Sequence, residues 1–207
     1  MQVELETPHG PARAHVEVAD DARAALVLGH GAGGGVAARD LVAAQQVALA
    51  EGVAVALVEQ PYLVAGRRSP APAPQLDAAW IAAVEQLLDG ALRALPLIAG
   101  GRSAGARVAC RTAAATGAVG VLCLAFPLHP PGRPEKSRQA ELDAVGLPVL
   151  VVQGESDPFG MPPAGPDREV VAVRGNHSLS SDVEGLRDAV RVWLRSVLAS
   201  RAVSGGR

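Results

Sequence analysis

Gly101-Arg102-Ser103-Ala104-Gly105 follows an apolar run, Leu95 to Ala99, and precedes a helical pattern that continues to Thr116. A G-x-S-x-G order between a strand and a helix is typical of a nucleophile elbow, in which a sharp turn holds an exposed serine in a strained backbone conformation. Glycines on both sides remove the Cβ atoms that would collide across so tight a turn. The pattern predicts Ser103 as a nucleophile, and its alternative is an ordinary N-cap serine at a helix start.

The composition predicts one soluble domain. The chain has 207 residues, 49% of them hydrophobic, which suits a single core, so we expect one domain over residues 1–199 and a flexible tail over residues 200–207. A net charge of -2 without a basic stripe argues against a nucleic-acid partner. The first six residues include two glutamates and form no apolar h-region, and no later stretch is long enough to span a bilayer, so we expect a cytoplasmic protein that does not bind membranes.

Short apolar runs alternate with longer helical patterns, which predicts βαβ units in a mainly parallel sheet. Two alternating segments around Pro8-His9-Gly10-Pro11 predict an antiparallel hairpin at the start. The expected fold is therefore an α/β fold with an eight-stranded, mostly parallel sheet, helices on both faces and no cap domain, because residues 125–147 have room for one short helix only. The expected strands cover residues 3–6, 13–18, 24–28, 53–58, 95–99, 119–124, 148–153 and 170–173, and the expected helices cover residues 39–50, 75–92, 104–116, 134–144 and 182–198.

A nucleophilic serine needs a base and a carboxylate that orients the base. Asp157 follows the seventh expected strand and His177 follows the eighth, so both should lie at the carboxyl edge of the sheet, where catalytic groups gather. Ser103, Asp157 and His177 also occur in the chain order typical of α/β-hydrolases. Glu155 is the rival for the acid and His129 for the base.

Backbone N–H groups that could stabilise a developing oxyanion are expected at two positions. The glycine-rich loop from Gly29 to Gly35 follows the third strand, the place from which such folds supply one donor, and the second donor comes from the residue after the nucleophile. These positions predict the N–H groups of Ala32 and Ala104.

On these residues the chain resembles the α/β-hydrolase superfamily, in particular its small cap-less members related to dienelactone hydrolase. It is also similar to the hydrolase-like proteins of a eukaryotic histone-acetyltransferase complex. The resemblance implies an α/β-hydrolase fold and a Ser-His-Asp triad. Dienelactone hydrolase itself is a cysteine enzyme, so its specific activity does not transfer to a chain with Ser103. The resemblance rests on residues 29–34, 61–68, 101–105, 127–132, 154–160 and 175–177.

The expected function is hydrolysis of a carboxylic ester or related acyl compound without a metal or organic cofactor. The residues expected to line the substrate pocket are Gly31, Tyr62, Arg67, His129 and Phe159. His30 is expected to hold its loop by bonding to the backbone.

Two alternatives remain open from the sequence. One is an interaction module that keeps the fold without turnover. The other is a nucleotide-dependent enzyme of Rossmann type, because Gly29-x-Gly31-x-x-Gly34 fits the dinucleotide fingerprint and Glu59 ends the next strand. Against the second, a hairpin precedes this strand and the Ser, Asp and His residues would be left unexplained.

Overall fold

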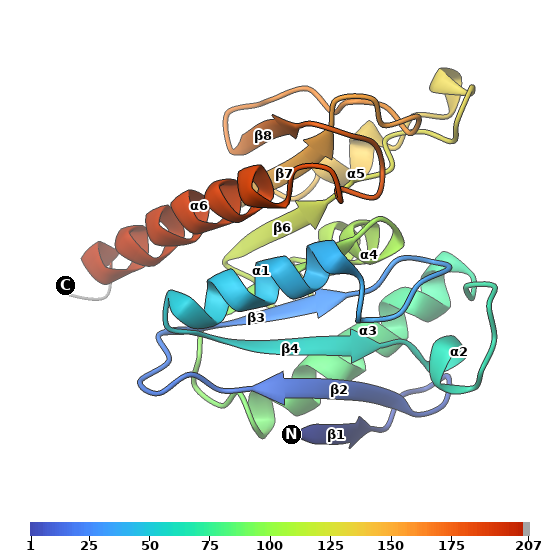
Figure 1. Cartoon of the computed structure of the whole chain (residues 1–207). Coiled ribbons are helices and arrows are strands. Elements are labelled where there is room, and N and C mark those ends of the chain that lie inside the picture. Colours follow the sequence, from blue (N-terminus) through green and yellow to red (C-terminus); the bar gives the residue numbers. More distant parts are fainter. Residues whose placement is uncertain (205–207) are drawn as a thin grey trace.

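Eight strands form one sheet in the order β1-β2-β4-β3-β5-β6-β7-β8 (Figure 1). The computed structural model describes the backbone of residues 1–204 and the side chains of residues 1–200. β1 and β2 form the antiparallel hairpin and the strands from β3 to β8 run parallel, so the predicted sheet is confirmed. The strands are β1 Gln2–Leu5, β2 Ala12–Glu17, β3 Ala24–Gly29, β4 Val53–Glu59, β5 Leu97–Arg102, β6 Gly120–Leu124, β7 Val149–Gly154 and β8 Arg168–Val173.

The helices depart from the predicted ones mainly at their ends. The short helix α2 was not predicted, because four residues are too few to show a helical period. α3 begins two residues earlier than predicted, and Pro74 is tolerated in its first turn because N–H groups there lack intrahelical acceptors. The predicted helix over residues 134–144 is divided into η1 and α5. The helices are α1 Arg39–Ala50, α2 Pro61–Val64, α3 Ala73–Asp89, α4 Ala104–Thr112, η1 Pro134–Lys136, α5 Gln139–Asp143 and α6 Val183–Ser204.

The C-terminal helix is longer than predicted. α6 continues to Ser204, past residue 200 where a flexible tail was expected, and residues 205–207 lie outside the described part of the chain. The apolar stripe of α6 is buried as its spacing predicts, with Leu186, Val190 and Leu194 all at 0% exposure. Among the described residues, no helix is both long and apolar enough to cross a membrane.

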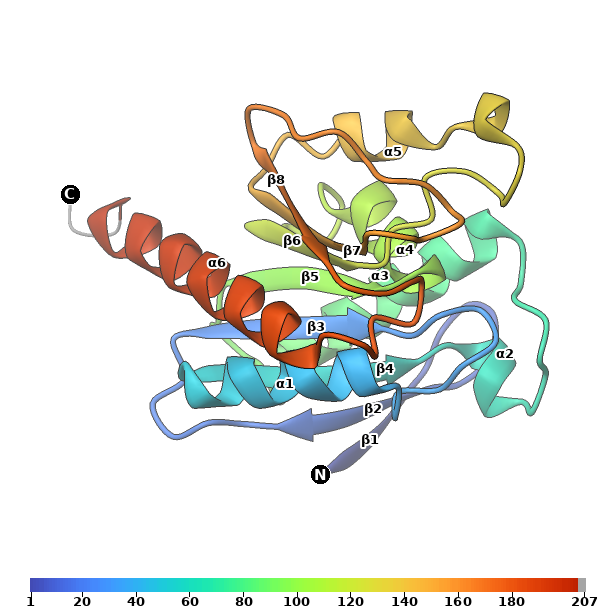
Figure 2. The ribbon, with the colours of Figure 1, turned by 45° about the horizontal axis from the view of Figure 1, so that its top comes forward.

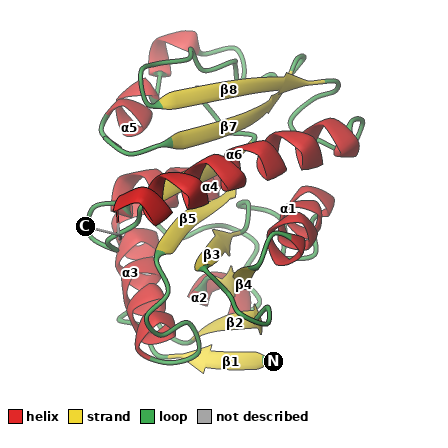
Figure 3. Cartoon of the chain, turned by 90° about the vertical axis from the view of Figure 1, so that its left-hand side faces the viewer, coloured by secondary structure: helices red, strands yellow, loops and turns green. Residues whose placement is uncertain are grey.

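Helices cover both faces of the sheet, as predicted. α1 and α6 pack together on one face, and α3 and α4 pack on the other (Figure 3). The central strands are therefore buried on both sides, which is why their sequences are almost continuously apolar. Between β6 and β7 the chain carries only η1 and α5, which matches the expected lack of a cap domain.

The carboxyl ends of the parallel strands meet at one edge of the sheet. Figure 1 shows the ends of β3 and β4 beside α2, and Figure 2 shows the loops that follow β3, β5 and β8 at the same edge. Gly29 at the end of β3 pairs with Gly101 in β5, and Gly154 at the end of β7 pairs with Val173 at the end of β8. This register brings together the turns that follow these four strands.

Candidate active site

Ser103 occupies the sharp turn between β5 and α4. Its backbone has φ 52° and ψ −109°, a left-handed conformation that costs a non-glycine residue free energy and that is typical of functional sites. The Ser103 N–H donates to the carbonyl of Leu124 at 2.9 Å, which ties the turn to the end of β6. Ser103 stands at the N-cap position of α4, as the alternative expected, but its side chain makes no capping hydrogen bond.

The glycines that flank Ser103 are required by a close approach of α4 to β3. A Cβ atom on Gly101 would lie 2.6 Å from the carbonyl oxygen of Gly29, and a Cβ atom on Gly105 would collide with the same backbone. These contacts involve backbone, which cannot rotate out of the way as a side chain can. The collision expected from the sequence is therefore present at both positions.

A continuous chain of hydrogen bonds joins Asp157, His177 and Ser103. His177 Nδ1 lies 2.8 Å from Asp157 Oδ2, and His177 Nε2 lies 2.9 Å from Ser103 Oγ. Because a carboxylate only accepts, Nδ1 carries the proton and donates, which leaves Nε2 to accept the serine O–H. This tautomer lets His177 take the serine proton while the carboxylate holds the ring in place.

Gln153, at the end of β7, holds the Asp157 carboxylate, and the sequence did not indicate this contact. Its side-chain Nε2 lies 2.8 Å from Asp157 Oδ2 and 2.8 Å from the Gly160 carbonyl, and the residue is fully buried. The N–H of Phe159 donates to the other carboxylate oxygen at 2.9 Å. Donors thus satisfy both oxygens of a carboxylate that is only 1% exposed, which offsets the cost of burying its charge. No sequence signal separates Gln153 from an ordinary strand residue.

The two rivals for the acid and the base lie elsewhere. Glu155 is exposed, and none of its side-chain atoms hydrogen bonds to His177. His129 Nδ1 interacts with the carbonyl of Pro130 at 2.9 Å, and the His129 N–H donates to the carbonyl of Phe159. Phe159 in turn packs on His177 with ring centroids 4.2 Å apart. Phe159 is therefore in direct contact with His177, and His129 contacts Phe159, so their role in substrate binding stays a prediction.

The glycine-rich loop after β3 approaches the elbow. A Cβ atom on Gly31 would lie 3.6 Å from the Cβ of Ser103, so this loop borders the serine. Ala104 is the first residue of α4, where N–H groups have no intrahelical acceptor. Within the described residues the Ala32 N–H has no acceptor either, although the Ala32 carbonyl accepts a hydrogen bond from Tyr62 Oη at 3.1 Å. Both amides are free to donate to a ligand.

His30 fixes the glycine-rich loop, as expected. Its Nε2 accepts the backbone N–H of Gln60 at 3.0 Å, so Nδ1 carries the proton and donates to the Gly31 carbonyl at 2.8 Å. Burial lowers the pKa of His30, which favours the neutral ring that this pattern requires. The loop is thereby tied to the end of β4.

Arg102 and Asp40 form a second link that the sequence did not predict. Arg102 Nε donates to Asp40 Oδ2 at 2.7 Å, and Arg102 Nη2 donates to the carbonyl of His177 at 3.2 Å. Asp40, in the first turn of α1, is 1% exposed. Burial raises the pKa of its carboxyl, while Arg102 acts in the opposite direction. One guanidinium thus connects the elbow, α1 and the histidine loop.

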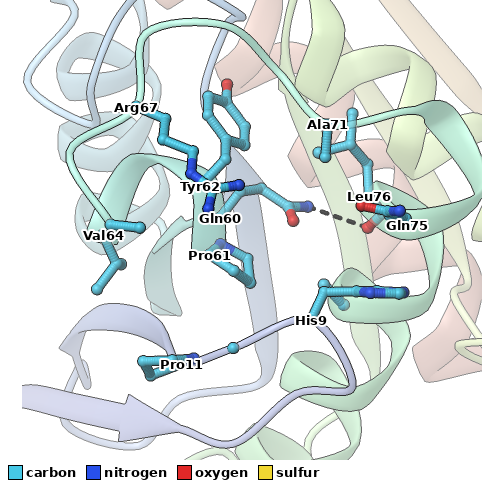
Figure 4. Close-up of a pocket in the computed structure, with 13 residues that line it drawn as sticks. His9, Pro11, Gln60, Pro61, Tyr62, Val64, Arg67, Ala71, Gln75 and Leu76 are labelled. Carbon is cyan, nitrogen blue, oxygen red and sulfur yellow. Dashed lines mark hydrogen bonds between the residues drawn. The ribbon is translucent and has the colours of Figure 1, made fainter.

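Two of the predicted substrate-binding residues lie in a separate pocket. Tyr62 and Arg67 line a pocket beside α2, together with Gln60, Pro61 and Leu76 (Figure 4). Ser103, Asp157 and His177 are not among the residues that line this pocket. The structure therefore places Gly31 beside Ser103 and Phe159 against His177, and places Tyr62 and Arg67 in a separate pocket.

The fold and this site define an α/β-hydrolase. The chain belongs to the alpha/beta hydrolase domain family, whose sequence profile matches residues 22–182. The predicted α/β-hydrolase fold is confirmed, and the alternative of a Rossmann-type fold is set aside. Gly29-x-Gly31-x-x-Gly34 is therefore part of a hydrolase loop.

Solved structures with the same fold include several hydrolases. A serine hydrolase without a lid from Xanthomonas campestris has a TM-score of 0.77 and 20% identity, covering 95% of this chain and 94% of that chain. Est1E from Butyrivibrio proteoclasticus has a TM-score of 0.77 and 16% identity, covering 96% and 99%. A dienelactone hydrolase from Anabaena variabilis has a TM-score of 0.75 and 15% identity, covering 95% and 96%. A search of curated proteins found no sequence match.

Proposed function

We propose that this protein is a serine hydrolase that cleaves a carboxylic ester or a related acyl compound. The observation that carries the proposal is the unbroken hydrogen-bond chain from Asp157 through His177 to Ser103, with distances of 2.8 and 2.9 Å. An arrangement of nucleophile, base and orienting carboxylate within hydrogen-bond reach is what acyl transfer requires. The names of two similar structures, a serine hydrolase and a dienelactone hydrolase, also support this reaction class.

The reaction proceeds in two halves. His177 Nε2 takes the proton of Ser103 Oγ as the oxygen attacks the substrate carbonyl, and the N–H groups of Ala32 and Ala104 stabilise the tetrahedral oxyanion. His177 then gives the proton to the leaving alcohol, and an acyl-serine remains. A water molecule, deprotonated by the same histidine, attacks the acyl-serine and releases the acid. Asp157 keeps the ring oriented and stabilises its charge throughout.

Labelling with a fluorophosphonate probe tests the nucleophile. We expect stoichiometric labelling of the wild-type protein at Ser103, located by mass spectrometry of peptides. Labelling should be lost in Ser103→Ala and unchanged in Ser137→Ala, which removes an exposed serine outside the site. Failure of the folded wild-type protein to react, or labelling that persists in Ser103→Ala, would refute the proposal.

Turnover separates an enzyme from an interaction module with the same fold. Against a panel of aryl and alkyl esters, Ser103→Ala should lower kcat by about 10⁴-fold or more, because the serine acts as a unit with its base. Labelling without hydrolysis of any ester would favour the interaction module.

The cytoplasmic location and the similarity to proteins of a histone-acetyltransferase complex stay predictions.

A further inference from the structure

A second pocket lies beside α2, at the edge of the sheet that also carries the elbow. It has a volume of about 200 Å³ and lies between α2, the start of α3 and the turn between β1 and β2 (Figure 4). Its walls are apolar and include Pro11, Pro61, Val64 and Leu76. The volume is smaller than the roughly 300–1,000 Å³ of sites for drug-sized ligands, so it suits a small metabolite.

The floor of this pocket carries an unpaired acceptor. The side chain of Gln60 lines the pocket and the residue is 6% exposed. Its Nε2 donates to the Leu76 carbonyl at 3.2 Å, whereas its Oε1 has no hydrogen-bond partner among the described residues. In Figure 4 the amide nitrogen faces Leu76, and the amide oxygen points downward in the view, to the side on which Pro61 and His9 lie. The carbonyl of Leu76 fixes this orientation, because a flipped amide would place two oxygens together.

The rim of the pocket carries a cation without a carboxylate. Within the described residues, the guanidinium of Arg67 makes no hydrogen bond or ion pair, and none of the 13 lining residues is acidic. Figure 4 shows the Arg67 side chain directed inward, toward Gln60. His9 and Gln75 add further polar groups to the rim. The pocket thus combines an acceptor at the floor, a cation at the rim and apolar walls.

The pocket is separated from the elbow. Gln60, Tyr62 and Leu76 border it on one side and border a cavity of about 10 Å³ on the other, and that cavity reaches Ala104. A volume of this size holds at most about one water molecule. A ligand in the pocket would therefore contact Tyr62, whose Oη donates to the Ala32 carbonyl, without reaching Ser103.

We propose that this pocket binds a small carboxylate that carries a hydroxyl group on an apolar body. The hydroxyl donates to Gln60 Oε1, which otherwise stays buried without a protein partner. The carboxylate pairs with the Arg67 guanidinium, whose planar fork suits two carboxylate oxygens. This site lies beside Ser103 and is distinct from it, so the proposal goes beyond the hydrolase reaction.

Calorimetric titration of the full chain with three matched probes tests the chemistry. 4-Hydroxybenzoate has the carboxylate and the hydroxyl, benzoate lacks the hydroxyl, and phenol lacks the carboxylate. At fixed ionic strength we expect saturable binding of one 4-hydroxybenzoate per chain. Benzoate and phenol should each bind with an affinity at least about tenfold lower, a difference of about 1.4 kcal/mol in binding free energy. Absence of saturable binding, or equal affinity for all three, would mean that the Gln60 oxygen accepts no hydrogen bond from a ligand and would overturn the proposal.

Adjacent arginines provide a matched control for the rim. Arg67→Ala should weaken 4-hydroxybenzoate binding at least about tenfold, whereas Arg68→Ala should leave it unchanged, because Arg68 does not line the pocket. Gln60→Leu should abolish the preference for 4-hydroxybenzoate over benzoate, with circular dichroism as the check of folding. If this variant does not fold, the wild-type comparison of the two probes still decides the role of the hydroxyl. Equal losses in the two arginine variants would refute the assignment.

The position of the site relative to the elbow is tested by blocking the serine. Protein labelled at Ser103, and the Ser103→Ala variant, should bind 4-hydroxybenzoate with unchanged affinity. Loss of binding on labelling would show that the pocket and the elbow form one site and would contradict the proposal. These readouts do not depend on hydrolysis, so an inactive protein would refute the proposed function and leave the pocket assignment standing.

Discussion

Replacing Arg102 by methionine should destabilise the protein strongly, because it leaves a buried carboxylate without its partner. Asp40 is 1% exposed and Arg102 is 20% exposed, with 2.7 Å between Nε and Oδ2. Breaking one side of a buried pair costs about 3–5 kcal/mol. Since Arg102 retains some contact with solvent, we expect a loss of about 3 kcal/mol near pH 7.

The loss should depend on pH in a defined direction. Burial already raises the pKa of Asp40 above its unfolded value, and removal of the guanidinium raises it further. A raised folded pKa gives stability that is present at low pH and lost as the pH rises through that value. The difference in stability between wild type and Arg102→Met should therefore be largest near neutral pH and should shrink toward pH 4.

Urea unfolding at several pH values measures this effect. Adding Asp40→Asn to Arg102→Met should recover part of the loss, and the double-mutant cycle should give a coupling of at least about 1 kcal/mol. Arg174→Met removes the exposed pair with Asp182 and serves as the matched control, with little change expected. A loss below about 1 kcal/mol for Arg102→Met, with no pH dependence, would refute the reasoning.

Three further predictions concern other parts of the fold. Gly105→Ala should cost about 1–3 kcal/mol in urea unfolding, because the new Cβ meets backbone, whereas Gly33→Ala has open space and should cost little; equal costs would contradict the close approach. If the proposed reaction holds, Gln153→Leu should lower kcat about 10- to 100-fold and shift the pH profile of kcat/KM, because it removes a hydrogen-bond donor to Asp157. An unchanged pH profile would argue that Gln153 does not position Asp157. The arginines of α6 lower the pKa of Glu51 in the folded protein. Wild type should therefore be more stable than Glu51→Gln above the pKa of the unfolded carboxyl, and this advantage should be lost as the pH falls through the folded pKa. An advantage that persists in acid would exclude this ion pair as its source.

The strands along the chain and the predicted site residues follow from local sequence patterns. All eight strands were predicted, with every end within three residues of the observed one, because apolar runs between turn residues mark strands buried on both faces. Ser103, Asp157 and His177 could be chosen because each lies within four residues after a strand, and parallel strands bring their carboxyl ends to one edge. The helix ends were less predictable. α2 is too short for a period, and α6 passes the point where its apolar stripe ends.

The sequence by itself determined the class of fold and three side chains that form one hydrogen-bond chain. Only the tertiary structure decided which groups hold those side chains and where the second pocket lies. In the sequence Gln153 is an ordinary strand residue, Arg102 is the variable position of the motif, and Asp40 is an acidic residue at a helix start. Arg102 and Asp40 are 62 residues apart in the chain, yet their side chains form a hydrogen bond. The pocket beside α2 is built from two segments that are far apart in the sequence, residues 9–11 and 60–79. Sequence periodicity tells which face of an element is buried, whereas strand register and helix packing determine which polar groups meet there.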